Sequence, residues 1–581
     1  MLLLAAVTAI VGATLIDGTG APPRQATVVI DGERILSVGS EPPPGAAVIR
    51  AEGHTLTPGF FDLHTHLPYS GVTGLTGDWG KNLKAYLYCG VTSVADFGTY
   101  PETFEPMRRL LGTGVLPGPR IHLAARITTP GGHGAEGGRG DFFSLEVITP
   151  EEARVATRRW LAYKPDAIKV FTDGWRYGTS ADMTSMEEPT LRAIVDEAHK
   201  QGVEVMTHTV TLERAKIAAR ADVDVIAHSV GDAPVDAELV KLLRAKRTAY
   251  VPTLAVSEFK PGPLAPLLRE VLEPAALKRV EPRPVRTPSP SRVTRWNTLL
   301  ANVANLRAAG ILIAAGSDAA GATGTLHGYS SLRELELLTA AGLTPLEAIT
   351  AATGESAKAI HVDHERGAIA AGMLADLVLI QGAPHENIHD IERIRRVWLG
   401  GKEIDRAQLQ RDIATATVTS IPSRKAVALV DDVEAERTNL DTQRVNATDS
   451  GLNHSTMMFQ RIARPGGGHA LAIQARMSVK TRPFVQLWLP LSKGAVEPVD
   501  ATQFRHVQFD VRGDGDYALL FSRRSLRTYN FPRTPFRGAA DWQTIQVPLP
   551  PNPADLTALA FEIVRAPGAL GWLEIDNVRF Q

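Results

Sequence analysis

The chain has 581 residues, of which 44% are hydrophobic and 22% charged, as in an ordinary globular protein. Its net charge of −1 provides no overall field that would attract nucleic acid or an anionic membrane surface. The single cysteine, Cys89, excludes an intrachain disulfide and any metal site built from several cysteines.

The first residues, MLLLAA, resemble a truncated signal peptide, but they lack a basic segment and an A-x-A cleavage site. The following TAIVGATLIDGTG alternates as a strand entering a turn does. No later segment reaches the roughly 18 apolar residues of a membrane-spanning helix. We therefore expect a soluble protein without a membrane partner, and its localisation, cytoplasmic or exported, is left open.

Short strands with turns occupy both flanks of a long middle region. ATVVIDGERILSVG indicates a hairpin with an Asp-Gly turn, and GAIAAGMLADLVLI and RRVWLGGKEI have the same texture. We expect residues 1–57 and 366–405 to form one small composite β-sandwich domain.

The middle region, 58–365, alternates apolar strands with amphipathic helical stretches such as EPTLRAIVDEAHKQG. Strands that alternate with helices predict parallel βαβ units, and eight such units close into a (β/α)8 TIM barrel of the α/β class. The strand candidates are GFFDLHTH, VTSVADFG, RIHLAAR, AIKVFTDG, VEVMTHT, DVIAHS, AYVPTL and ILIAAGSD.

A Pro- and Arg-rich stretch, 258–297, interrupts the barrel between its last two strands. It is interpreted as a surface excursion, with a lid over the barrel mouth as the alternative. After it, residues 406–424 are expected to be a linker. Residues 425–581 contain alternating strands such as FRHVQFDVRG and predict a separate all-β jelly-roll domain.

Polar residues with metal-binding chemistry stand at the ends of several barrel strands. His64 and His66 are two apart in a strand, so both imidazoles lie on one face. Because active sites of TIM barrels lie at the carboxyl ends of the strands, we expect these residues to meet there. The candidate metal ligands are His64, His66, Lys169, His208, His228 and Asp318.

Lys169 lies in the apolar strand AIKVF, where a lysine is seldom fully buried without a partner. Pairing with Asp173 is the simple explanation. Beside a metal site, however, burial and positive charge lower the pKa of a lysine and make its neutral amine accessible. A neutral amine can add carbon dioxide to give an anionic carbamate. We therefore predict carboxylated Lys169 bridging two divalent ions, with zinc expected, one held by His64 and His66 and the other by His208 and His228.

The order H-x-H, Lys, His, His, Asp resembles the amidohydrolase superfamily. LTPGFFDLHTHL, AGSDA, ELELLTAAGLTPLEAITAATGESAKAI and GAIAAGMLADLVLI support this resemblance, which covers about 8–405. The chain is most similar to the imidazolonepropionase-like and prolidase-like group, which implies hydrolysis of dipeptides or N-acyl amino acids. PGGHG is similar to the glycine loop of that group and implies that His133 binds substrate. Ala227 departs from the acidic residue that often precedes the sixth-strand histidine, which puts a contact behind His228 in doubt.

The C-terminal WQTIQVPLP and WLEIDNVRF are similar to domains of the CIA30 type, which have a galactose-binding-like jelly roll. Trp542 and Trp572 could stack on a sugar, but strand aromatics more often lie in a core, which is the interpretation we favour. A glycan contact by this domain and a homo-oligomer are both compatible with the sequence.

The resulting hypothesis is amide hydrolysis of a small-molecule substrate by a hydroxide between two metal ions, with Asp318 as the proton shuttle. A lactonase or esterase and a cyclic-amide hydrolase are alternatives with the same chemistry. A deaminase fits less well, because such enzymes usually use one metal without the lysine. An inactive barrel that serves as a binding or scaffold protein is the alternative of another class.

Overall fold

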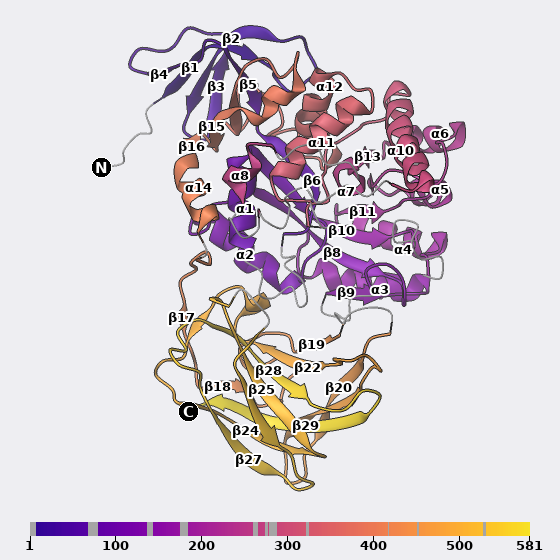
Figure 1. Ribbon diagram of the computed structural model, residues 1–581, viewed down its shortest axis with the longest axis vertical. Coiled ribbons are helices and arrows are strands. Elements are labelled where there is room, and N and C mark those ends of the chain that lie inside the picture. The colour runs from indigo at the N-terminus through magenta and orange to yellow at the C-terminus, as the bar shows by residue number, and fades with distance from the viewer. Residues whose placement is uncertain are drawn as a thin grey trace.

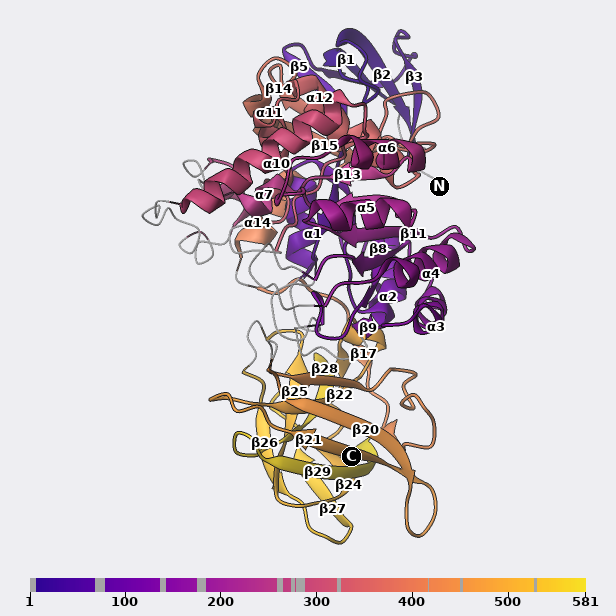
Figure 2. The same cartoon turned by 90° about the vertical axis from the view of Figure 1, so that its right-hand side faces the viewer.

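The computed structural model describes the chain except residues 1–6, 68–78, 136–142, 175–183, 259–264, 273–276, 278–287, 321–324, 416, 450–452 and 527–529. Half of the stretch expected as a surface excursion or lid, 258–297, lies outside the described residues. Figures 1 and 2 show a small β domain at one end of the molecule, a barrel in the middle and a second β domain at the other end.

Seven parallel strands form the wall of the barrel, each paired with the next along the chain. Helices alternate with these strands along the chain, and the predicted TIM barrel is confirmed. The strands are β6 (Phe60–Thr65), β7 (Val91–Asp96), β8 (Arg120–Thr128), β10 (Ala167–Phe171), β11 (Glu204–His208), β12 (Val225–Ala227) and β13 (Ala249–Val251), and β9 (Ser144–Glu146) pairs with β8.

The eighth strand candidate, 311–318, closes the barrel without being a regular strand. On one side the Ala314 amide donates to the Tyr250 carbonyl at 3.0 Å. On the other side the Asp318 amide donates to the His64 carbonyl at 2.8 Å. Asp318 and Ala320 have φ angles of 52° and 68°, outside the extended range, so the ladder breaks at this point. The chain thus joins the first and seventh strands through scattered hydrogen bonds.

The helices surround the barrel (Figure 1). The helix α3 (Pro150–Leu161) begins at a complete capping box, in which Thr149 and Glu152 each bond the other's backbone. The helices of the barrel are α1 (Trp79–Tyr88), α2 (Phe104–Gly112), α3 (Pro150–Leu161), α4 (Glu188–His199), α5 (Leu212–Arg220), α6 (Ala237–Lys246), α7 (Leu254–Ser257), α8 (Leu268–Val271), α10 (Pro290–Ala308), α11 (Tyr329–Ala340), α12 (Pro345–Thr350) and α13 (Ser356–Ala359).

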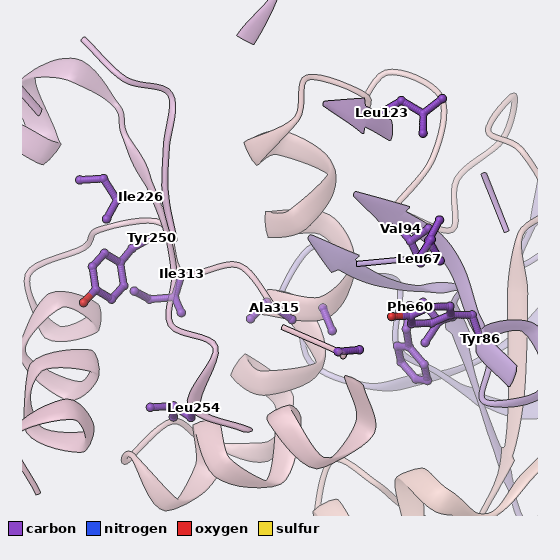
Figure 3. Close-up of a cluster of buried hydrophobic side chains, with 14 of the residues drawn as sticks. Phe60, Leu67, Tyr86, Val94, Leu123, Ile226, Tyr250, Leu254, Ile313 and Ala315 are labelled. Atoms are coloured by element: carbon purple, nitrogen blue, oxygen red, sulfur yellow. The ribbon is translucent and has the colours of Figure 1, made fainter. Parts of the chain in front are cut away.

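Two apolar layers lie on opposite sides of the barrel wall because neighbouring strand residues point in opposite directions. Phe60 and Val94 pack outward against the helices, in the cluster that Figure 3 shows. Phe61 and Ala95 point inward and belong to a separate cluster inside the barrel. In β10 and β11 the inward residues Ala167 and Met206 belong to this inner cluster, and Lys169 and His208 stand two positions further along on the same face.

Both flanks of the barrel contribute to one eight-stranded sheet. The antiparallel pairing of β5 with β14, which sets Leu56 opposite Leu379, joins the N-terminal strands to the later ones. The strands are β1 (Thr8–Leu15), β2 (Arg24–Asp31), β3 (Arg34–Val38), β4 (Ala47–Arg50), β5 (His54–Pro58), β14 (Leu377–Gln381), β15 (Ile394–Leu399) and β16 (Lys402–Glu403).

The structure differs from the expected linker at 406–424, because the helix α14 (Arg406–Ala414) lies there. Asp405 caps this helix by accepting a hydrogen bond from the Gln408 amide. Asp412 pairs with Lys84 of α1 at 2.6 Å, so the segment packs on the barrel.

The C-terminal region is a pair of β-sheets that enclose their own apolar core. Trp542 and Trp572 are absent from that core, contrary to the interpretation favoured above. Both are half-buried, and the Arg512 guanidinium lies 5.8 Å from the centre of each ring.

The strands of the C-terminal region fall into two sheets. One sheet contains β17 (Arg424–Lys425), β19 (Val445–Thr448), β22 (Val485–Pro490), β23 (Val499–Asp500), β25 (Asp516–Arg523), β26 (Arg533–Arg537) and β28 (Leu556–Ile563). The other contains β18 (Leu429–Asp431), β20 (Thr456–Ala463), β21 (His469–Arg476), β24 (His506–Gly513), β27 (Gln543–Pro548) and β29 (Leu570–Phe580).

Within the described residues, no helix is both long enough and apolar enough to cross a bilayer.

Candidate metal centre

Three of the predicted ligands meet at the carboxyl end of β6 and the segment that closes the barrel. The His66 Nε2 atom lies 3.0 Å from Asp318 Oδ1, and the His64 Nε2 atom lies 3.5 Å from the same oxygen. The His64 and Asp318 side chains are both 1% exposed. The Asp318 carboxylate therefore meets the two imidazoles in a buried space, although it stands far from them in the sequence.

The two later histidines lie beside this group. The His228 ring is centred 4.6 Å from that of His64 and 4.4 Å from that of His208. His228 and Asp318 have φ angles of 74° and 52°, a left-handed conformation that costs free energy for residues other than glycine. The surrounding structure holds both residues in this conformation. Their side chains thereby point toward the other histidines of the cluster.

Lys169 is 1% exposed and occupies an inward position of β10. Its Nζ atom lies 4.3 Å from the centre of the Phe97 ring and 5.0 Å from that of Phe171. Burial and the nearby Arg126 guanidinium lower the pKa of the Lys169 ammonium far below its usual value. The carboxylate that opposes this shift is Asp318, and among the described residues no ion pair joins Lys169 to Asp173. Asp173 accepts hydrogen bonds from Thr211 Oγ1 at 2.7 Å and from the Val210 amide.

Three of the histidines, His64, His66 and His228, are held in their neutral form. Burial lowers the pKa of His228 to about 3, and burial together with neighbouring positive charge lowers the pKa of His64 well below 6.5. The pKa of His66 is lowered for the same main reason, with Asp318 opposing it. Neutral imidazole is the form that coordinates a metal ion.

Buried hydrogen bonds fix the orientation of the ligands. His228 Nδ1 lies 2.7 Å from Thr253 Oγ1, which leaves Nε2 to face the cluster. Glu334 accepts the Leu254 and Ala255 amides at 2.8 and 2.7 Å, and thereby fixes the turn that carries Thr253. The contact behind His228 that Ala227 puts in doubt is therefore supplied by Thr253.

Asp62 braces the other side of the centre. Its carboxylate accepts hydrogen bonds from the Ser317 amide at 2.9 Å, from Ser317 Oγ at 2.5 Å and from Ser331 Oγ at 2.6 Å. The His64 amide donates to it at 3.2 Å. One buried carboxylate thus connects the start of the H-x-H motif to the residue before Asp318.

Replacing Thr253 by valine should weaken metal binding by roughly 10- to 100-fold, as expected when a hydrogen bond behind a histidine ligand is lost. Metal titration of the purified protein measures this effect. Thr248→Val is the matched control, because Thr248 is also buried but lies just before β13, at the amino end of that strand, where it donates to the Val223 carbonyl. Equal metal affinity in both variants would contradict the role of Thr253.

His133 lies next to the cluster, as its predicted role requires. Its ring centre is 4.4 Å from that of His208 and 4.9 Å from that of Phe171. Its carbonyl accepts a hydrogen bond from Thr128 Oγ1 at 2.6 Å, which ties the glycine loop to the end of β8. The loop therefore brings a side chain to the edge of the centre.

The residues present fit a metal ion. His64, His228 and Asp318 each offer one ligand atom, and these three atoms lie within 4.8 Å of one another. Among the described residues His64 Nδ1 is buried without a hydrogen-bond partner. Imidazole nitrogen and carboxylate oxygen suit zinc and similar divalent ions.

Comparison with known proteins places the chain in a family. The model of the amidohydrolase family matches residues 55–404, more than half of the chain, so the chain belongs to that family and is an amidohydrolase. The C-terminal domain lies beyond this match, and its likeness to CIA30 domains stays a prediction.

Individual relatives agree with the family assignment. Ochratoxinase of Aspergillus niger is 25% identical over 453 residues, which cover 68% of this chain and 86% of that protein. Imidazolonepropionase of Chromobacterium violaceum is 27% identical over 355 residues, 57% of this chain and 78% of that one. A crystal structure of a Xaa-Pro dipeptidase with bound methionine superposes with a TM-score of 0.57 at 25% identity, covering 69% of this chain and all of that one.

Several residues around the centre were not found from the sequence. Arg126 pairs in register with Lys169 across β8 and β10, and Phe97 stacks on His64 with ring centres 3.8 Å apart. The strand-end position of Arg126 was a usable signal, since a charged residue in RIHLAAR is as unusual as Lys169 in AIKVF. Thr253 gave no signal, because its role depends on a contact between the ends of the two neighbouring strands β12 and β13.

Proposed function

We propose that the chain is a binuclear metal-dependent hydrolase that cleaves the amide bond of dipeptides or N-acyl amino acids. The observation that carries the proposal is the group of four histidines, Asp318 and Lys169 at the carboxyl ends of the barrel strands. The family membership and a Xaa-Pro dipeptidase among the similar structures support the amide as the bond that is cleaved. Two bound divalent ions would supply a hydroxide nucleophile at neutral pH and polarise the scissile carbonyl.

Each residue of the centre has a defined task. His64 and His66 would hold one ion, and His208 and His228 the other. The neutral Lys169 amine would attack carbon dioxide and release one proton, and the resulting carbamate oxygens would bridge the ions. The lowered pKa of Lys169 supports this step, because an ammonium group has no lone pair for the attack.

Asp318 would move the proton. Its carboxylate accepts a proton from the attacking water and donates it to the nitrogen of the leaving amine. An amine leaves poorly without a proton, so this transfer matters more for amides than for activated esters. Asp318 Oδ1 lies 3.0 Å from His66 Nε2, so the carboxylate is beside the candidate metal ligands.

His133 would donate a hydrogen bond to the bound substrate. His133→Ala should raise KM roughly tenfold or more, as expected for the loss of one hydrogen bond to a charged group, and change kcat less. Steady-state kinetics on the same amide measures this. His361→Ala is the control, since that side chain is 70% exposed. An unchanged KM in His133→Ala would remove the residue from the substrate site.

A substrate screen and metal analysis test the proposal together. Zinc-loaded protein is assayed against N-acyl amino acids, dipeptides and lactones, and its metal content is measured. About two ions per chain with turnover of amides supports the proposal. Turnover of lactones alone would replace it by the esterase alternative, and absence of bound metal after supplementation would favour the scaffold alternative.

A further inference from the structure

The C-terminal domain has a sheet that is apolar on both faces. In β28, Leu559 and Phe561 point into the domain's own core, whereas Ala558 and Ala560 point the other way. The outward face is covered by the barrel. A single buried cluster contains Tyr100 and Phe143 of the barrel together with Val445, Ala447, Trp488, Ala495, Ala518, Leu520, Ala558 and Ala560 of the C-terminal domain. Alanines at five of these positions leave a shallow surface that accepts two aromatic rings.

An ion pair with a buried carboxylate and a half-buried arginine joins the two parts beside this cluster. Glu102, which is 3% exposed, lies in the short 3-10 helix η1 (Pro101–Thr103) that follows β7. Its carboxylate pairs with the Arg437 guanidinium and accepts the Gln443 amide at 3.1 Å. Tyr100 Oη also donates to it at 2.9 Å. A buried carboxylate needs such partners, and apart from Tyr100 they come from the C-terminal domain.

The backbones of the two parts also approach closely. Gly494, in the 3-10 helix η4 (Lys493–Ala495), packs against Thr103. A Cβ atom at this glycine would lie 2.5 Å from Thr103 Cγ2, so no larger residue fits without displacement. An apolar cluster, an ion pair with a buried carboxylate and a close backbone contact together describe a tightly packed interface.

The barrel residues of this interface lead directly to the metal centre. Phe143 lies under the Arg126 guanidinium at 4.6 Å, and the same guanidinium lies 4.9 Å from the Phe171 ring. Phe171 in turn contacts His133 and Lys169 Nζ. In the neighbouring connection, only two residues separate Tyr100 from Phe97, which stacks on His64.

We infer that the C-terminal β domain is a docked part of the hydrolase that positions one wall of the substrate pocket, through Phe143 and the 97–103 connection. The metal ligands are held from within the barrel, by Thr253 and Asp62 among others. Loss of docking should therefore leave metal binding intact and loosen the wall where His133, Phe171 and Arg126 lie. The domain thus acts through positioning residues, without itself touching the reacting atoms.

Ala560→Glu in the full-length protein tests the inference, because it places a charge in the middle of the apolar interface. Ala463→Glu is the matched control, since Ala463 is exposed on β20 of the same domain. We expect a larger radius of gyration in solution scattering and faster hydrogen exchange in residues 97–103 and 143–147. On the amide that the wild type hydrolyses, KM should rise at least tenfold while kcat stays within about threefold and metal content is unchanged.

A second pair of variants each removes one partly exposed arginine, one at the interface with the barrel and one inside the C-terminal domain. Arg437→Met breaks the contact to Glu102, whereas Arg512→Met breaks a contact to Glu574 inside the C-terminal domain. Only Arg437→Met should reproduce the effects of Ala560→Glu. Undocking with unchanged exchange in 97–103 and 143–147 would overturn the inference, and so would a compact particle in both interface variants. These readouts do not depend on turnover, so they are distinguishable from a failure of the proposed amide hydrolysis.

Discussion

Asp318→Asn should reduce kcat for amide hydrolysis by roughly 10²- to 10⁴-fold, the usual contribution of a general acid–base group. The amide side chain keeps the size of the carboxylate but cannot accept and return the proton. The histidines remain, so metal content should stay close to that of the wild type. Kinetics on an N-acyl amino acid and elemental analysis of the same sample measure both quantities.

Asp224→Asn is the matched control for this experiment. Asp224 precedes β12, opposite the carboxyl end where the centre lies, and accepts the Val205 amide at 2.7 Å. The control should keep its activity. Amide turnover retained by Asp318→Asn would contradict the assignment of Asp318 as the proton shuttle. A loss of metal equal to the loss of activity would instead assign Asp318 a purely structural role as a ligand.

Lys169→Ala should lower the metal content from about two ions per chain to one or fewer and abolish most activity. The variant lacks the anionic bridge, so two adjacent cations would be held by the four histidines and Asp318 only, and their mutual repulsion would be poorly compensated. Propionate added at high concentration should partly restore metal and activity, because its carboxylate can occupy the space of the carbamate. Lys169→Arg is the control, since a guanidinium retains the positive charge and cannot form the carbamate.

Two results would contradict the carbamate. One is a full complement of metal in Lys169→Ala without any added carboxylate. The other is electron density for an unmodified Lys169 side chain in the metal-loaded protein. Either result would leave the four histidines and Asp318 as the complete ligand set.

Much of the barrel could be predicted from the sequence because its signals are local. The alternation of apolar residues within a strand and the helical period between strands need no knowledge of distant contacts. The same alternation places His64 on the same face as His66 and directs Lys169 to the inside of β10. The prediction was less accurate where packing overrides local pattern, as in the irregular segment before Asp318, in α14 and at Trp542.

The sequence by itself determined the class of protein and the kinds of residue in its centre, since both are carried by short motifs at strand ends. Only the tertiary structure decided what surrounds them. Thr253 behind His228, Arg126 beside Lys169 and Glu102 against Arg437 are pairs whose members come together only when the chain folds. Such contacts depend on the closure of the barrel and the docking of the last domain, and no local pattern of residues encodes them.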